Sequence, residues 1–319
     1  MKPDKTLLAL AATVLLWASA FPAIRVALHG YGPAELSLLR LAVASAALLA
    51  VAPLMRVRRP ARGDLPRIVL VGASGMSAYQ LLLNWGELHV PAGTASLIVA
   101  VAPAISALLA AVFLRERLTA ARITGSCVAL AGAAVIAVAG GDTGYTAAAW
   151  IVLAAAGAQA LYHLGIKPLL RVYTGLEVAA YAMWAGTALL LPLAPAAVRA
   201  VVHAPVEADL AALYLGALPS AAGFVLWGYA VARLTVTAAT AALYLVPAVA
   251  LGVAFVWLGE RPHPVELAGG LLTLAGVALV GRPTGARRGV RVTAADGQGA
   301  APAQEDPPRG DGSTPTVRV

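Results

Sequence analysis

Polar side chains recur at helical spacing inside a stretch that is otherwise apolar. Met76, Gln80 and Asn84 follow one another at four-residue steps, with Tyr79 beside them, and residues at this spacing share one face of a helix. Amide and phenol groups donate and accept hydrogen bonds. The pattern predicts a face that either hydrogen-bonds to a small solute or links neighbouring helices, the latter worth about 0.6 to 2 kcal/mol in a membrane.

A second face of this kind contains Gln159, Tyr162 and His163, at positions i, i+3 and i+4. A titrating His163 could couple transport to protons, but a neutral, hydrogen-bonded histidine is the favoured interpretation. Other polar and aromatic side chains lie near the middle of apolar stretches. The residues predicted to line a central substrate cavity are Trp17, Tyr79, Gln80, Asn84, Ser96, Gln159, Tyr162, His163, Trp227, Thr240 and Tyr244.

The sequence lacks the residue patterns that common catalytic mechanisms require. The chain has no Gly-x-x-x-x-Gly-Lys phosphate loop, and its lysines are Lys2, Lys5 and Lys167. Its five histidines are far apart in sequence, with no cysteine or carboxylate at the spacing of metal ligands. We therefore expect no enzyme activity, no catalytic residue, no metal and no cofactor.

The acidic residues avoid the centres of the apolar stretches. Glu35, Glu87, Glu177 and Glu266 all lie near the ends. This argues against an antiport mechanism that uses a buried carboxylate, although Glu35 or Glu177 could reach inward. Arg40 is expected to extend outward or to pair with Glu35, and binding of a substrate carboxylate is the alternative.

Composition defines the class of protein. Apolar residues make up 60% of the chain and charged residues 12%, against about 25% charged in soluble domains. Ten apolar runs have about the 20 residues that a helix needs to cross a bilayer, and they lack the alternation of barrel strands. The sequence predicts an all-α integral membrane protein with ten transmembrane helices, at 6–28, 33–55, 67–86, 93–114, 119–139, 147–166, 175–196, 209–231, 235–258 and 264–281.

The positions of the Lys and Arg residues predict how the chain is oriented in the membrane. With the amino terminus inside, all but four of the 23 Lys and Arg residues lie in cytoplasmic loops or the tail, as the positive-inside rule requires. The four exceptions are Arg25, Arg40, Arg199 and Arg261. Both termini are therefore expected in the cytoplasm. The net charge of +8 orients helices and does not indicate a nucleic-acid partner, because the arginines form no single groove lined with aromatics.

The chain repeats itself. Residues 103–134 match 247–278 without a gap, 144 positions later. The unit has five helices, and because five is odd the second copy enters the membrane from the opposite side, which gives an inverted repeat. The predicted organisation is a first repeat at 6–139, a second repeat at 147–281, and a disordered cytoplasmic tail at 282–319.

Two features that occur once in each repeat could allow movement or closure of the cavity. Pro103 and Pro247 lie near the middle of their helices and are expected to kink them, either as packing features or as a flexible gate. Glu116-Arg117 and Glu260-Arg261 end the same helices. An interfacial anchor is favoured for these acid-base pairs, and a gating ion pair is the alternative.

Small residues seven apart mark two other helices. Gly125 and Gly132, matched by Gly269 and Gly276, suit close helix packing. Packing within one chain is favoured over packing between chains, so the protein is expected to be a monomer or a homodimer. Trp85, Trp150 and Trp257 are expected to contact lipid or the membrane interface.

The chain resembles the EamA family of the drug/metabolite transporter superfamily over residues 6–281. The resemblance rests on Trp17 to Arg25, on Arg40-Leu41-Ala42, on Ala92 to Leu97 continuing through Pro103 to Leu118, and on Pro247 to Arg261. It implies two inverted five-helix repeats that move small organic solutes, often as exporters of amino acids, other metabolites or toxic cations. It also implies that helices 1, 3, 4, 6, 8 and 9 surround the cavity.

Together these features predict a secondary transporter in the plasma or inner membrane. It would export small metabolites, such as amino acids or related amphipathic compounds, by alternating access of the two repeats. Its partners would be a small-molecule substrate and the lipid bilayer. The alternatives are a polytopic receptor or sensor without transport and, among transporters, a cationic-drug or nucleotide-sugar carrier.

Overall fold

The computed structural model describes residues 4–114, 119–139, 143–234 and 242–280. Within these ranges all regular structure is helical, which confirms the predicted all-α class. The elements of the first half are α1 (Lys5–Ala27), α2 (Pro33–Val51), η1 (Arg62–Asp64), α3 (Leu65–Val71), η2 (Gly72–Ala78), α4 (Tyr79–Gly86), α5 (Ala92–Val99), α6 (Ala102–Leu114) and α7 (Ala120–Ala139).

The second half follows a similar order, with α10 as an additional helix. Its elements are α8 (Thr143–Leu169), α9 (Gly175–Leu190), η3 (Leu191–Leu193), α10 (Ala194–His203), α11 (Val206–Leu215), η4 (Gly216–Ala222), α12 (Gly223–Val231), α14 (Leu245–Leu258) and α15 (Pro264–Val280). Residues Met1–Pro283 form one compact unit. The predicted tail at 282–319 lies outside the described residues.

Eight helices in the described part are long and apolar enough to cross a membrane. Several of them join consecutive elements, as α11, η4 and α12 do between Val206 and Val231. The two further apolar helices, α14 and α15, have 14 and 17 residues. Each of these ten helices overlaps one of the predicted apolar runs.

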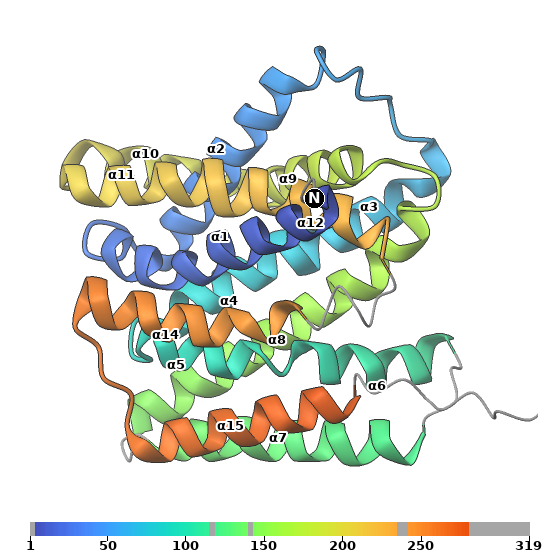
Figure 1. The fold of residues 1–319 in the computed structure, drawn as a ribbon. Helices are drawn as coiled ribbons and strands as arrows, with labels where there is room; N and C mark the ends of the chain where they lie inside the picture. Colours follow the sequence, from blue (N-terminus) through green and yellow to red (C-terminus); the bar gives the residue numbers. More distant parts are fainter. Residues whose placement is uncertain (1–3, 115–118, 140–142, 235–241, 281–319) are drawn as a thin grey trace, which may run out of the picture. The chain divides into compact units, whose positions relative to one another are not determined.

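The first helix of each half packs mainly on the other half. Helix α1 lies against α11, α12 and α14, while α8 lies against α4, η2, α5 and α6. In Figure 1 the blue α1 accordingly lies among the gold and orange helices of the second half. The two halves are therefore interlocked instead of standing as two separate domains.

The glycine faces pack within the chain. Helices α7 and α15 run alongside each other (Figure 1). A Cβ on Gly125 would lie 2.6 Å from the Gly276 carbonyl oxygen, and a Cβ on Gly132 would lie 2.6 Å from that of Gly269. The predicted intramolecular packing is confirmed, because only glycine lets these two backbones approach so closely.

Two π-helical segments lie at equivalent places in the halves. Segment η2 begins at Gly72 and η4 begins at Gly216, 144 residues later. Both glycines allow close approach of another helix: a Cβ on Gly72 would meet that of Ala185 at 2.7 Å, and one on Gly216 would meet that of Val43 at 2.5 Å. Nothing in the spacing of the apolar residues predicts these segments. Such π-helical turns are rare in proteins, and where they occur they often lie at functional sites.

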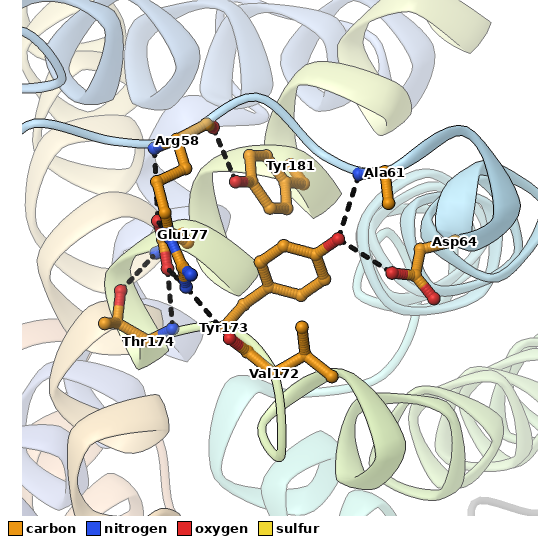
Figure 2. Close-up of polar contacts among 8 residues, drawn as sticks. All are labelled: Arg58, Ala61, Asp64, Val172, Tyr173, Thr174, Glu177 and Tyr181. Atoms are coloured by element: carbon orange, nitrogen blue, oxygen red, sulfur yellow. Dashed lines mark hydrogen bonds and ion pairs between the residues drawn. The ribbon is translucent and has the colours of Figure 1, made fainter.

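A polar cluster joins the segment after α2 to the start of α9 (Figure 2). The Arg58 guanidinium forms a two-pronged ion pair with Glu177, with Nε 2.8 Å from Oε1 and Nη2 2.9 Å from Oε2. The Arg58 backbone N–H also donates to Glu177, at 3.1 Å. Thr174 and Glu177 form a capping box at the beginning of α9. Both carboxylate oxygens of Glu177 thus accept hydrogen bonds from neighbouring groups at the beginning of α9.

Two tyrosines complete this cluster. The Tyr181 hydroxyl donates to the Arg58 carbonyl at 2.6 Å, and the Tyr173 hydroxyl donates to Asp64 at 2.7 Å while accepting from the Ala61 N–H at 3.0 Å. The cluster therefore connects the first half to the second through charged and neutral hydrogen bonds at a helix end (Figure 2).

We expect Gly276→Ala to destabilise the protein. The added methyl group would meet the α7 backbone at Gly125 and Ala129, and overpacking of this kind costs about 1 to 3 kcal/mol. Thermal unfolding of the purified protein in detergent measures the effect. Gly252→Ala is the matched control, since in the described part of the chain nothing lies within 4 Å of a Cβ at that position. Equal unfolding midpoints for the two variants would contradict the packing argument.

We expect Glu177→Gln to lower the free energy of unfolding by about 1 kcal/mol, the contribution of a charge-assisted hydrogen bond discounted for the exposed side of the pair. The reason is that Arg58 would lose its anionic partner. Glu207→Gln makes the same chemical change at an exposed position of α11 and is expected to have a smaller effect. The comparison uses thermal unfolding at low salt, and a loss that is no larger than that of the control would argue against the ion pair as a stabilising contact.

Candidate functional site

A cavity lies where helices of the two halves meet. It contains about 770 Å³ of space, including the part open to the surroundings. Both halves contribute to its wall. The lining residues are Trp17, Ala20, Phe21, Arg40, Tyr79, Leu83, Ser96, Val99, Ala100, Ala102, Pro103, Gln159, His163, Pro219, Phe224, Leu243, Tyr244, Val246 and Pro247.

Aromatic rings form one side of this cavity. Trp17 of α1 packs against Phe224 and Trp227 of α12, with ring centroids 5.0 and 5.4 Å apart. The Trp17 indole N–H donates to the Pro219 carbonyl at 3.2 Å. Pro219 lies inside the π-helical η4. The indole thus holds the first helix against an irregular turn of the second half and presents an apolar face to the cavity.

The paired prolines lie at helix interruptions in the cavity wall. Helix α5 ends at Val99 and α6 begins at Ala102, just before Pro103. Helix α14 begins at Leu245, just before Pro247. Proline has no N–H to donate to the carbonyl four residues earlier. The wall therefore includes backbone that is not regular helix, which a membrane protein tolerates only inside the protein or beside a cavity.

Helix α8 supplies polar side chains beside the aromatic rings, since the His163 ring centroid lies 5.7 Å from that of Trp227. Gln159 Nε2 lies 3.4 Å from His163 Nε2, and both residues line the cavity. Gln159 Oε1 and His163 Nδ1 are buried and have no hydrogen-bond partner within the described structure. These two atoms can serve a ligand. No three His, Cys, Asp or Glu side chains of the described residues are grouped so as to hold a metal ion.

Arg40 enters the cavity from α2, so the expectation that it extends outward or pairs with Glu35 is wrong. Its side chain is 4% exposed. Nη1 donates to Asn84 Oδ1 at 3.0 Å, and Asn84 Nδ2 donates to Ser37 Oγ at 2.8 Å. Arg40 remains inside because α4 offers an amide at the same depth. Outward extension would have left that amide oxygen without its donor.

The structure brings together six of the predicted site residues in this cavity: Trp17, Tyr79, Ser96, Gln159, His163 and Tyr244. Gln80, Asn84, Tyr162 and Trp227 are buried beside it but do not line it. Thr240 lies outside the described residues. The lining residues that were not predicted from the sequence include Pro219 and Phe224. Pro219 could have been found, because it interrupts an apolar run as Pro103 and Pro247 do.

An ion pair lies at the ends of α1 and α14. Arg25 Nε is 3.7 Å from Glu260 Oε1, and the Gly93 N–H at the start of α5 donates to Glu260 Oε2 at 3.4 Å. The Arg25 guanidinium also donates to the carbonyl oxygen of Glu87. The ends of four helices, α1, α4, α5 and α14, are thereby connected. The corresponding Glu116-Arg117 pair lies outside the described residues.

Several known proteins are similar to this chain in sequence. The chain is 65% identical over 288 residues to a "probable terminal-alkyne amino-acid exporter" of Streptantibioticus cattleyicolor, covering 90% of this chain and 97% of the relative. It is 37% identical to an "uncharacterized transporter" of Bacillus subtilis, covering 82% and 86%. It is 27% identical to a "probable amino-acid metabolite efflux pump" of Salmonella typhimurium, covering 83% and 90%.

A solved crystal structure shares the fold. It has a TM-score of 0.59 and 21% sequence identity, and the match covers 86% of this chain and 95% of the other. The sequence pattern of the EamA-like transporter family matches twice, at residues 4–138 and 146–282. The chain belongs to the EamA-like transporter family and is a multi-pass protein of the cell membrane.

Proposed function

We propose that this protein exports amino acids across the cell membrane by secondary transport. The observation that carries the proposal is the cavity between the two halves, with an aromatic wall, neutral polar groups and one buried arginine. Two relatives named as amino-acid or amino-acid-metabolite exporters support the cargo class.

Alternating access of two inverted repeats is the mechanism that we propose. In this arrangement ten helices cross the membrane with both termini in the cytoplasm, as the distribution of Lys and Arg favours. The interruptions at Pro103 and Pro247 would act as the flexible wall segments. The Arg25–Glu260 pair would hold one end of the cavity closed and would separate when that end opens.

The charge of the cavity favours an amino acid over the other cargoes. A cationic drug would meet the fixed positive charge of Arg40. A nucleotide sugar carries two negative phosphates, and of the described lining residues Arg40 alone has a permanent positive charge. An amino acid is a zwitterion, and its carboxylate, ammonium and apolar side chain are complementary to the one cation, one neutral acceptor and aromatic wall of this cavity.

Transport in liposomes tests the proposed function. We expect purified protein to exchange external labelled L-propargylglycine or L-leucine for internal unlabelled amino acid well above the rate of empty liposomes. Tetraphenylphosphonium and UDP-glucose, supplied in the same way, should stay at the background rate. Binding without exchange would favour the receptor alternative. Exchange of the cation or the nucleotide sugar alone would overturn the proposed cargo.

We expect Trp17→Ala to raise the KM of exchange about tenfold, because the variant loses the indole face and the contact with Pro219 and each factor of ten corresponds to about 1.4 kcal/mol. Trp85→Ala is the matched control, since Trp85 is 58% exposed and lies outside the cavity. The same KM in both variants would remove Trp17 from the proposed binding surface.

A further inference from the structure

Arg40 is a permanent charge in the wall of a largely apolar cavity. Taking a guanidinium out of water costs several kcal/mol unless an anion and hydrogen-bond acceptors compensate for it. Arginine cannot lose its proton under physiological conditions. A compensating partner is therefore required, and its identity bears on what the cavity binds.

The protein supplies only part of that compensation. Arg40 Nη1 has Asn84 as its acceptor, but Nε is buried and has no acceptor in the described part of the protein. After Tyr79, the acidic side chain of Glu87 is the group that attracts Arg40 electrostatically. Among the described residues, however, the two form no ion pair within 4.0 Å, and both Glu87 carboxyl oxygens are also without a partner.

Asn84 fixes the orientation of the guanidinium. Its amide nitrogen donates to Ser37 Oγ at 2.8 Å, and Ser37 in turn donates to the Pro33 carbonyl at 2.6 Å. The amide oxygen of Asn84 therefore faces Arg40 and holds Nη1. A side chain fixed in this way is preorganised for a ligand, because little rotamer freedom is lost when the ligand binds.

We propose that Arg40 binds the carboxylate of the exported amino acid, an inference that rests on the proposed amino-acid transport. The Nε edge of a guanidinium presents two parallel N–H groups, which match the two oxygens of a carboxylate. Gln159 Oε1, which is buried without a partner in the described structure and belongs to another lining residue of the cavity, is the acceptor for the substrate ammonium. The aromatic rings of Trp17, Phe21 and Phe224 then contact the apolar side chain.

A pair of ligands that differ only in the carboxylate tests this assignment. L-propargylglycine and its methyl ester both carry the ammonium group and the same side chain. Binding to the full-length protein in detergent is measured by titration calorimetry. We expect the wild type to bind the ester at least tenfold more weakly than the acid, because the ester offers no negative charge to Arg40.

Arg40→Gln should bind the acid as weakly as the ester while its affinity for the ester stays unchanged, so the preference disappears. Arg40→Lys keeps the charge but loses the two-pronged geometry, and it should retain part of the preference. Arg199→Gln is the matched control, because Arg199 is exposed on α10, and it should keep the full preference.

Two results would overturn the inference about Arg40 and leave the proposed amino-acid transport standing. One is a wild-type protein that transports amino acids but binds acid and ester equally, a comparison that needs no variant. The other is a folded Arg40→Gln protein that still prefers the acid. A wild type that neither binds nor exchanges any amino acid would instead overturn the proposed function, and the inference with it.

Discussion

A backbone inside hydrocarbon must satisfy its own hydrogen bonds, and that constraint determines where this protein can have a site. A continuous helix meets it anywhere in the membrane. A helix interrupted by proline or widened into a π turn meets it only in the protein interior or beside an internal cavity. The interruptions near Pro103 and Pro247, and Pro219 within η4, all lie in the wall of one cavity. The irregular backbone and the candidate site thus have a common cause.

The large-scale fold was readable from the sequence because hydrophobic length and duplication are properties of whole segments. The apolar runs coincide with the described helices, and the glycine faces of α7 and α15 meet as their spacing indicated. Side-chain direction was harder to predict. Spacing tells which residues share a helix face, but not which neighbour that face meets.

Helix α4 illustrates this limit. Tyr79 and Leu83 line the cavity, whereas Gln80 and Asn84, each one residue further on, do not. One residue corresponds to about 100° of rotation around a helix, enough to turn Asn84 toward Ser37 and Arg40 of α2. The π-helical η2 just before α4 also changes the rotation per residue, so a regular helical spacing from Met76 to Asn84 does not describe this face. The Arg58–Glu177 cluster depends on loop geometry, for which the periodicity of helices holds no information.

The interlocking of α1 with the second half has a consequence for biosynthesis. The residues of α1 are translated long before those of α11, α12 and α14, on which α1 packs, because the earliest of these three helices begins only at Val206. While the residues before Val206 are being translated, the nascent α1 lacks most of its final neighbours, and the acceptor of the Trp17 indole at Pro219 does not yet exist. Closure of the bundle is therefore a late event, completed when α11, α12 and α14 reach a helix that was synthesised well before them.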